Sequence, residues 1–226
     1  MKEEEMNIIY RITSYKQWNP GPVYGDDKWK MVVLCHNSFL KAKTDEPVTY
    51  ILDTCPPEWS SYFIQHGTVI NRNGGGQYDV LSSVQHMFRQ AKDMEGKILM
   101  VEDDYLWRPD TIKNIWRGLD EFKMVSPYDH PTHYLESRYS DFQFKLKLID
   151  NIVWRNGPSN THTFATTGEY IREHWKSFNA RNYDDIFFRS LPDQIWMPVG
   201  NSFATHMATG FLAPDIDWEK IYGMDK

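Results

Sequence analysis

The residues best suited to chemistry are three consecutive acids, Glu102, Asp103 and Asp104, which directly follow the apolar segment KILMV. That segment is short and rich in branched side chains, which predicts a buried strand ending at the acids. Adjacent carboxylates repel one another unless a cation or hydrogen bonds compensate them. Mg²⁺ and Mn²⁺ prefer oxygen ligands, and Mg²⁺ usually combines one or two carboxylates with water and phosphate oxygens. The acids therefore indicate a divalent-metal site for a nucleoside diphosphate, although a solvated acidic turn is the simpler alternative.

The extended backbone at this strand end also predicts which acids lie together. Successive side chains of an extended segment point to opposite sides. We therefore expect Glu102 and Asp104 to share one side and Asp103 to face the other.

Three further features are suited to binding a nucleotide. Asp53 ends another apolar segment, YILD, where its carboxylate could accept hydrogen bonds from a base or ribose, or simply form a turn. Asn73, Gly74 and Gly75 precede a helical pattern; glycine lets the backbone approach a ligand there, but a flexible turn would look the same. No Gly-Lys-Ser/Thr follows, so this is not a P-loop. Arg11 could supply positive charge beside a phosphate, or form a structural ion pair.

The elements that must position these residues alternate along the first half of the chain. Short apolar runs predict strands at 7–12, 48–52, 68–70 and 97–101. Apolar residues spaced by three and four predict helices at 80–91 and 112–122, the latter after Pro109 at a first helical position. We also expect a helix at 31–42, because this stretch lies between two strands. This alternation predicts an α/β fold with a right-handed, mostly parallel sheet flanked by helices. Such sheets bind ligands at the carboxyl ends of their strands.

The second half mixes polar and aromatic residues. We expect strands at 142–154 and 161–166, with a turn at Asn156-Gly157-Pro158 between them. Thr166 and Glu169 have the spacing of a capping box at the start of a helix, and 184–191 predicts one more short helix. A mixed half after a nucleotide-type half places the ligand across their junction.

Composition limits the class of protein. A chain of 226 residues that is 41% hydrophobic predicts one domain, residues 1–226, with a core of its own. The net charge of −6 argues against nucleic acid as a partner. Cys35 and Cys55 are too few for a disulfide framework, the start is acidic, and no apolar run reaches the roughly 18 residues of a membrane span. We therefore expect a cytoplasmic protein with no integral membrane segment.

Aromatic residues are unusually frequent, with 9 Trp, 13 Tyr and 12 Phe. Most aromatic rings lie in protein cores, but this surplus suggests that some pack against a flat ligand such as a sugar. The candidates are Tyr105, Trp107, Trp154, Trp175 and Trp196.

In their order and spacing, YRIT at Arg11, ILD at Asp53, NGGG at Asn73 and VEDDY at Asp104 resemble a glycosyltransferase of the GT-A fold, in the family-2-like group that uses nucleotide-diphosphate sugars. VEDDY corresponds to the acidic DXD metal motif of that group. The resemblance spans residues 7–218.

Two later segments continue the resemblance. Tyr183-Asp184-Asp185 is similar to the acidic pair at the start of a helix whose second carboxylate is the catalytic base of inverting members; Asp184 stands where glutamate is more usual. His206 resembles a late histidine that often binds the metal or diphosphate.

The resemblance implies specific roles. Mn²⁺ or Mg²⁺ is expected on Asp104, Glu102 and His206, and the nucleotide-sugar donor on Arg11, Asp53, Asn73, Gly74, Gly75 and Asp103. Asp185 is the expected base that accepts a proton from the acceptor, a glycan or another hydroxyl compound, with inversion at the anomeric carbon. Residues of about 7–104 form the donor half and about 105–226 the acceptor half of a GT-A type Rossmann-like fold.

Three other functions remain open. A sugar nucleotidyltransferase also places acids and metal on such a sheet, but the early chain lacks a glycine-rich basic loop to bind a triphosphate. A non-catalytic nucleotide-sugar or glycan-binding module would not need Asp104, Asp185 and His206 together. A glycosidase needs two acids, and the metal-type cluster would then have no purpose.

Overall fold

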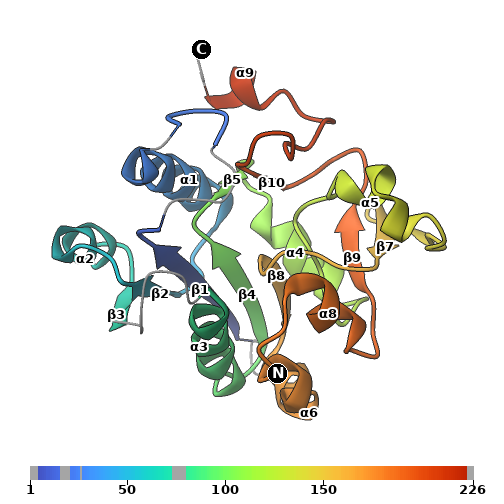
Figure 1. The fold of residues 1–226 in the computed structure, drawn as a ribbon, viewed down its shortest axis with the longest axis horizontal. Coiled ribbons are helices and arrows are strands. Elements are labelled where there is room, and N and C mark those ends of the chain that lie inside the picture. Colours follow the sequence, from blue (N-terminus) through green and yellow to red (C-terminus); the bar gives the residue numbers. More distant parts are fainter. Residues whose placement is uncertain (1–4, 16–20, 26, 73–79, 223–226) are drawn as a thin grey trace.

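A computed structural model describes residues 5–15, 21–25, 27–72 and 80–222 (Figure 1). The elements run in the order β1 (Met6–Thr13), α1 (Lys28–Ala42), β2 (Val48–Asp53), α2 (Pro57–Phe63), β3 (Thr68–Arg72), α3 (Val80–Lys92), β4 (Lys97–Glu102), β5 (Tyr105–Trp107), α4 (Ile112–Leu119), α5 (Thr132–Leu135), η1 (Ser137–Tyr139), β6 (Leu146–Ile149), β7 (Ile152–Gly157), β8 (Phe164–Thr167), α6 (Gly168–Glu173), α7 (Trp175–Phe178), α8 (Asp184–Arg189), β9 (Ile195–Pro198), β10 (Ala204–His206) and α9 (Trp218–Tyr222).

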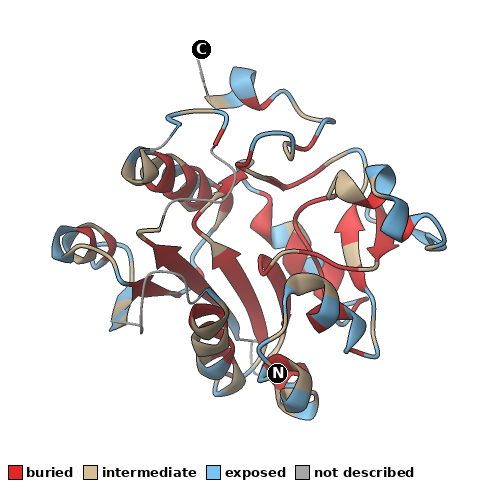
Figure 2. Ribbon diagram, viewed as in Figure 1, coloured by how far each residue is buried: buried red, intermediate tan, exposed pale blue. Residues whose placement is uncertain are grey.

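The main sheet has five strands in the order β3-β2-β1-β4-β8. The first four are parallel, and β8 joins β4 antiparallel. The sheet is covered on both faces, which is why its strands are apolar runs. On β1, Ile8 packs in the cluster that contains Phe39 of α1, whereas its neighbour Ile9 packs in the cluster that contains Phe88 of α3. Figure 2 shows β1, β2 and β4 buried between the helices, whereas the edge strand β3 is partly exposed. The predicted parallel sheet with helices on both faces is confirmed.

Two small antiparallel sheets complete the second half. One has the order β6-β7-β9, at the right of Figure 1, and the other pairs β5 with β10. The predicted turn at Asn156-Gly157-Pro158 was wrong, because β7 continues to Gly157. The chain turns instead at Asp150 and Asn151, whose φ angles of 48° and 63° suit a tight two-residue hairpin. Gly157 allows Met197 to pack closely against the backbone, because a Cβ at this position would lie 2.3 Å from Cε of Met197.

Two predicted helix starts also differ. The N-cap of α6 is Thr167, whose hydroxyl accepts a hydrogen bond from the Tyr170 amide, whereas Thr166 lies in β8 and donates to the Lys123 carbonyl. Helix α4 begins at Ile112 and not at Pro109, because Asp110 has a φ of 58°, which an α-helix does not accommodate. In the described part of the chain, no helix is long and apolar enough to cross a membrane.

Candidate active site

The carboxyl ends of β1 and β4 meet at one edge of the main sheet. Glu102 is the last residue of β4 and pairs in register with Arg11 of β1. The chain then turns through Asp103 and Asp104 into β5. Because β5 pairs antiparallel with β10, with Tyr105 opposite His206, the late histidine lies beside the acidic turn. The fold thus brings together five residues that the sequence predicted for the site, Arg11, Glu102, Asp103, Asp104 and His206.

The three acids have different partners. Glu102 accepts hydrogen bonds from the Arg11 guanidinium at 2.5 Å and from the His162 amide at 3.0 Å. Asp103 accepts from the Thr13 amide at 2.8 Å and from Nζ of Lys28 at 2.7 Å. Both ion pairs are almost fully buried. Protein cations therefore compensate two of the three charges. The expected alternation does not apply beyond Glu102, because the strand ends there and the next two residues form a turn.

Asp104 is the acid that lies next to a histidine. Its Oδ2 is 3.2 Å from Nε2 of His206. The imidazole stacks on Tyr105, with ring centroids 5.3 Å apart, and its buried Nδ1 has no hydrogen-bond partner among the described residues. Burial is the largest single influence and lowers the pKa of His206, but the carboxylates of Asp104, Glu102 and Asp184 together raise it by more, so the net shift is upward.

The donor types of Asp104 and His206 fit a divalent cation. A carboxylate oxygen and an imidazole nitrogen are both ligands of first-row metals, including Mn²⁺. Among the described residues, no group of three His, Cys, Asp or Glu side chains is close enough to hold a metal ion. A cation bound by this pair would therefore take its other ligands from substrate or water, as is usual for Mg²⁺ at phosphate sites.

A cavity of about 370 Å³ opens over this turn. Its walls include Arg11, Lys28, the three acids, His162, Asp184 and His206. The volume is within the range of small-molecule sites, and charges of both signs line it. It is large enough for a polar ligand to contact the acidic turn from outside the sheet.

Of the four remaining donor-side predictions, one lies elsewhere and three cannot be placed. Asp53 ends β2 in register with Thr13, but its Oδ2 accepts a hydrogen bond from Arg72 at 2.6 Å and it is not among the residues that line the cavity. Asn73, Gly74 and Gly75 lie outside the described residues.

The acidic pair of α8 lies at the boundary between two cavities. Asp184 lines the first cavity, where its Oδ1 is 3.2 Å from Nδ1 of His162, and it also lines a second cavity of about 320 Å³. Asp185, the predicted base, lines only the second cavity. Its Oδ1 accepts a hydrogen bond from the Tyr139 hydroxyl at 2.8 Å. The cavities share Thr161, Tyr183 and Asp184, so a ligand could extend from one to the other.

A buried polar cluster adjoins the second cavity, whose wall includes His133. Arg155 is 2% exposed and donates to Asp129 through Nε at 2.9 Å and to Nδ1 of His133 at 2.8 Å. Burial raises the pKa of Asp129, although Arg155 opposes that shift. For His133 burial acts in the other direction and lowers the pKa to about 2, so its imidazole is neutral. Asp129 therefore pairs with the buried guanidinium of Arg155. His130, the next residue in the chain, lines the second cavity.

Three of the five candidate sugar-binding rings belong to the core. Tyr105, Trp107 and Trp154 are at most 1% exposed, so they cannot stack on a ligand. The exposed ring at the site is Tyr183, which is 72% exposed and lines both cavities.

Comparison with known proteins identifies the fold. No protein-family model matches the sequence, and no curated protein matches it. The chain is similar in structure to TarS 1-349 from S. aureus, with a TM-score of 0.53 and 10% identity over 88% of this chain and 60% of that chain. It is also similar to the glycosyltransferase GlyE from Streptococcus pneumoniae TIGR4, with a TM-score of 0.51 and 11% identity over 86% of this chain and 45% of that chain.

A third similar structure is a nucleotidyl transferase from Methanothermobacter, Mth528, with a TM-score of 0.50 and 11% identity over 85% of this chain and 88% of that chain. At these identities the likeness shows the fold alone. The fold is thus of the type shared by GT-A-like glycosyltransferases and nucleotidyl transferases. Within that type, the chain spans less than two thirds of the TarS and GlyE chains it matches.

Proposed function

We propose that the protein is a metal-dependent, inverting glycosyltransferase that moves a sugar from a nucleotide-diphosphate donor to an acceptor hydroxyl. The observation that carries the proposal is the arrangement of two acidic sites in adjoining cavities. Asp104 and His206 lie in the first cavity, Asp185 lies in the second, and Asp184 borders both. A donor bound in the first cavity would present its anomeric carbon toward the second.

The metal and donor roles belong to the first cavity. Asp104 and His206 would hold Mn²⁺ or Mg²⁺, which supplies positive charge to the leaving diphosphate. Arg11 and Lys28 bring two further cations to the same wall. Their ion pairs with Glu102 and Asp103 fix the acidic turn, so the position of Asp104 is set before a ligand binds. Glu102 and Asp103 therefore contribute to donor binding by holding this turn in place, in addition to any direct contact with the ligand.

The acceptor role belongs to the second cavity. A hydroxyl that attacks the anomeric carbon must lose its proton, and a carboxylate within hydrogen-bond reach can accept it. Asp185 is 28% exposed on its side chain, so its carboxylate is open to a ligand from this cavity. A single displacement with one base inverts the anomeric configuration.

Product analysis tests this proposal. The protein is incubated with UDP-, GDP- and dTDP-sugars, Mn²⁺ and a panel of hydroxyl acceptors, and separately with nucleoside triphosphates and sugar 1-phosphates. We expect a nucleoside diphosphate and a glycosylated acceptor. Pyrophosphate would identify a sugar nucleotidyltransferase instead, and binding of nucleotide sugars without any product would identify a binding module.

Two variants assign the chemistry. Asp185→Asn should retain donor binding while transfer falls by at least about 100-fold, the lower range for general base catalysis. Asp93→Asn, an exposed acid at the end of α3, is the matched control and should transfer sugar as the wild type does. Transfer by Asp185→Asn near the wild-type rate would mean that another group is the base.

A further inference from the structure

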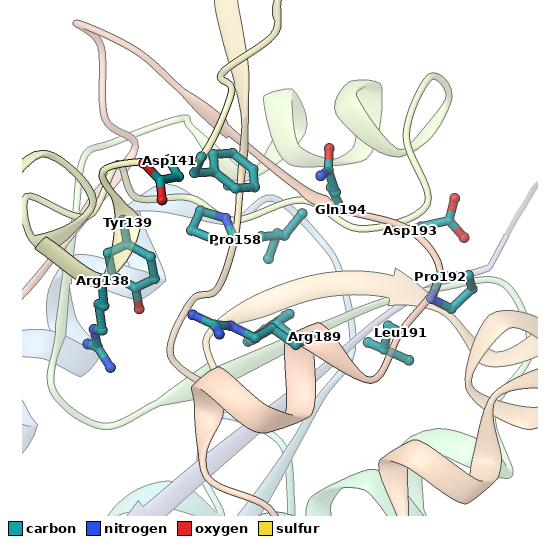
Figure 3. Close-up of a pocket in the computed structure, with 13 residues that line it drawn as sticks. Arg138, Tyr139, Asp141, Pro158, Arg189, Leu191, Pro192, Asp193 and Gln194 are labelled. Carbon is teal, nitrogen blue, oxygen red and sulfur yellow. The ribbon is translucent and has the colours of Figure 1, made fainter. Parts of the chain in front are cut away.

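A third cavity, of about 430 Å³, lies beside α8 and β9 on the acceptor side (Figure 3). Its floor is apolar and well packed, because Phe188, Leu191 and Ile195 are each less than 10% exposed. Charged side chains of both signs stand around this floor, with Arg138, Arg189 and Asp141 at one side and Asp193 at the other. An apolar floor with a polar rim of planar groups suits a ligand that has both carbon faces and polar substituents.

The two arginines connect this cavity to the proposed base. Nη1 of Arg138 and Nη2 of Arg189 are 3.7 Å and 3.5 Å from the same oxygen, Oδ2 of Asp185. Charge-assisted hydrogen bonds are shorter, about 2.7–2.9 Å, so neither guanidinium is closely bound to this oxygen. The side chains are 50% and 55% exposed, and each guanidinium has five N–H donors. Both guanidiniums therefore have N–H donors left for a further anionic partner from solvent.

The third cavity adjoins the second, because the two share wall residues. Arg138 and Tyr139 line both. The ring of Tyr139 packs under the Arg138 guanidinium at 4.7 Å, and Arg138 also pairs with Glu136, so the guanidinium is held at the boundary. A ligand with its hydroxyl beside Asp185 would extend past Arg138 into the third cavity.

We propose that the third cavity binds an anionic group of the acceptor, a phosphodiester or a carboxylate, one unit away from the hydroxyl that receives the sugar. This inference rests on the proposed function and names the class of acceptor. Arg138 and Arg189 bind the anion. The anion competes with Oδ2 of Asp185 for the same guanidiniums, so acceptor binding leaves that oxygen available for the acceptor's hydroxyl proton.

Acceptor binding is tested in the absence of donor and metal. Three oligomers are titrated into the full chain by calorimetry at low ionic strength: oligo(glycerol phosphate), oligogalacturonate and neutral maltohexaose. We expect one or both anionic oligomers to bind at least about tenfold more tightly than the neutral one. The two anionic arms distinguish a phosphodiester from a carboxylate.

Substitution of the arginines locates the site. Arg138→Gln and Arg189→Gln are made singly and together, since exposed side chains on this rim are not needed for packing. The double variant should lose at least about tenfold in affinity for the anionic oligomer, and each single variant should lose part of that. Arg117→Gln, an exposed arginine of α4, is the matched control and should bind as the wild type does.

The outcomes separate this inference from the proposed function. If no anionic oligomer binds, if maltohexaose binds equally well, or if the arginine variants retain full affinity, the inference is overturned. None of these results depends on a donor, so nucleotide-sugar transfer can succeed when this test fails. Conversely, anion binding lost in the arginine variants supports the site even if product analysis identifies a different reaction.

Discussion

The hydroxyl of Tyr139 donates a hydrogen bond of 2.8 Å to Oδ1 of Asp185. The same hydroxyl is 2.8 Å from Oγ of Ser159, which in turn is 3.3 Å from Nε2 of His133. Nδ1 of His133 accepts from Arg155, because a guanidinium can only donate. The neutral imidazole must then carry its proton on Nε2, so the donors run in one direction, from Arg155 to Asp185. This relay holds the carboxylate of Asp185 in one orientation.

Tyr139→Phe should therefore impair the chemical step rather than donor binding. Loss of a hydrogen bond to a charged group costs about 1.5–3 kcal/mol, which corresponds to roughly a 10- to 150-fold lower kcat. Steady-state kinetics should show this loss with little change in KM for the nucleotide sugar. Tyr24→Phe removes an exposed hydroxyl distant from the relay and should leave both constants unchanged. Equal kcat values for Tyr139→Phe and wild type would mean that the relay does not position the base.

Lys28 and Asp103 form a buried ion pair whose side chains are 9% and 6% exposed. Lys28→Met should lower the free energy of unfolding by about 3 kcal/mol, because it leaves a buried carboxylate uncompensated. The double variant Lys28→Met/Asp103→Asn should be more stable than Lys28→Met alone. Urea denaturation measures both.

The matched control for this pair is a surface ion pair of the same helix. Lys30 and Asp27 are 64% and 41% exposed on their side chains, so Lys30→Met should cost no more than about 1 kcal/mol. A similar small loss for Lys28→Met would show that the Asp103 pair does not support the acidic turn.

The stability of the fold should fall in mild acid. His36 is fully buried between the hydroxyls of Tyr50 and Tyr62, and burial lowers its pKa to about 3. The unfolded chain binds a proton at this residue near pH 6.5, whereas the folded chain does not. The contribution of His36 to the free energy of unfolding is therefore complete above pH 6.5. It is lost as the pH falls toward 3, at about 1.4 kcal/mol per pH unit.

His36→Gln should remove this residue's share of the pH dependence, about 1.4 kcal/mol per pH unit, and leave the share of His133, whose pKa burial also lowers. Urea denaturation between pH 7 and pH 5 measures the pH dependence of the free energy of unfolding. The control Tyr62→Phe removes a hydroxyl that contacts His36 but keeps the histidine, so it should retain this pH dependence. A variant without His36 that loses stability with pH as steeply as the wild type would disprove this origin of acid sensitivity.

The main sheet could be predicted because β1, β2 and β4 are buried on both faces and so stand out as apolar runs. Helix α3 was equally clear, since its apolar residues repeat at helical spacing. The acids at the end of β4 followed from that strand, because ligands bind parallel sheets at this edge. Local signals were enough for these elements.

Other features depend on contacts between distant residues. Nothing around Lys28 predicts its pairing with Asp103, 75 residues away, and the same is true of Arg155 and Asp129. In sequence Thr166 is the better cap, because Glu169 follows three residues later; only the pairing of β8 with β4 decides that Thr167 caps α6. Strand β5 has three residues, too few for a periodic pattern, yet its pairing with β10 brings His206 to the site.

In the proposed function, Asp104 and His206 hold a divalent cation that binds the diphosphate of the donor. Calorimetric titration of UDP and GDP, with and without Mn²⁺, tests this role in the wild type, Asp104→Asn and the control Asp93→Asn. In the wild type and the control, Mn²⁺ should tighten binding of at least one nucleotide by about tenfold or more, and Asp104→Asn should lose this gain. Equal gains from Mn²⁺ in all three proteins would contradict this role.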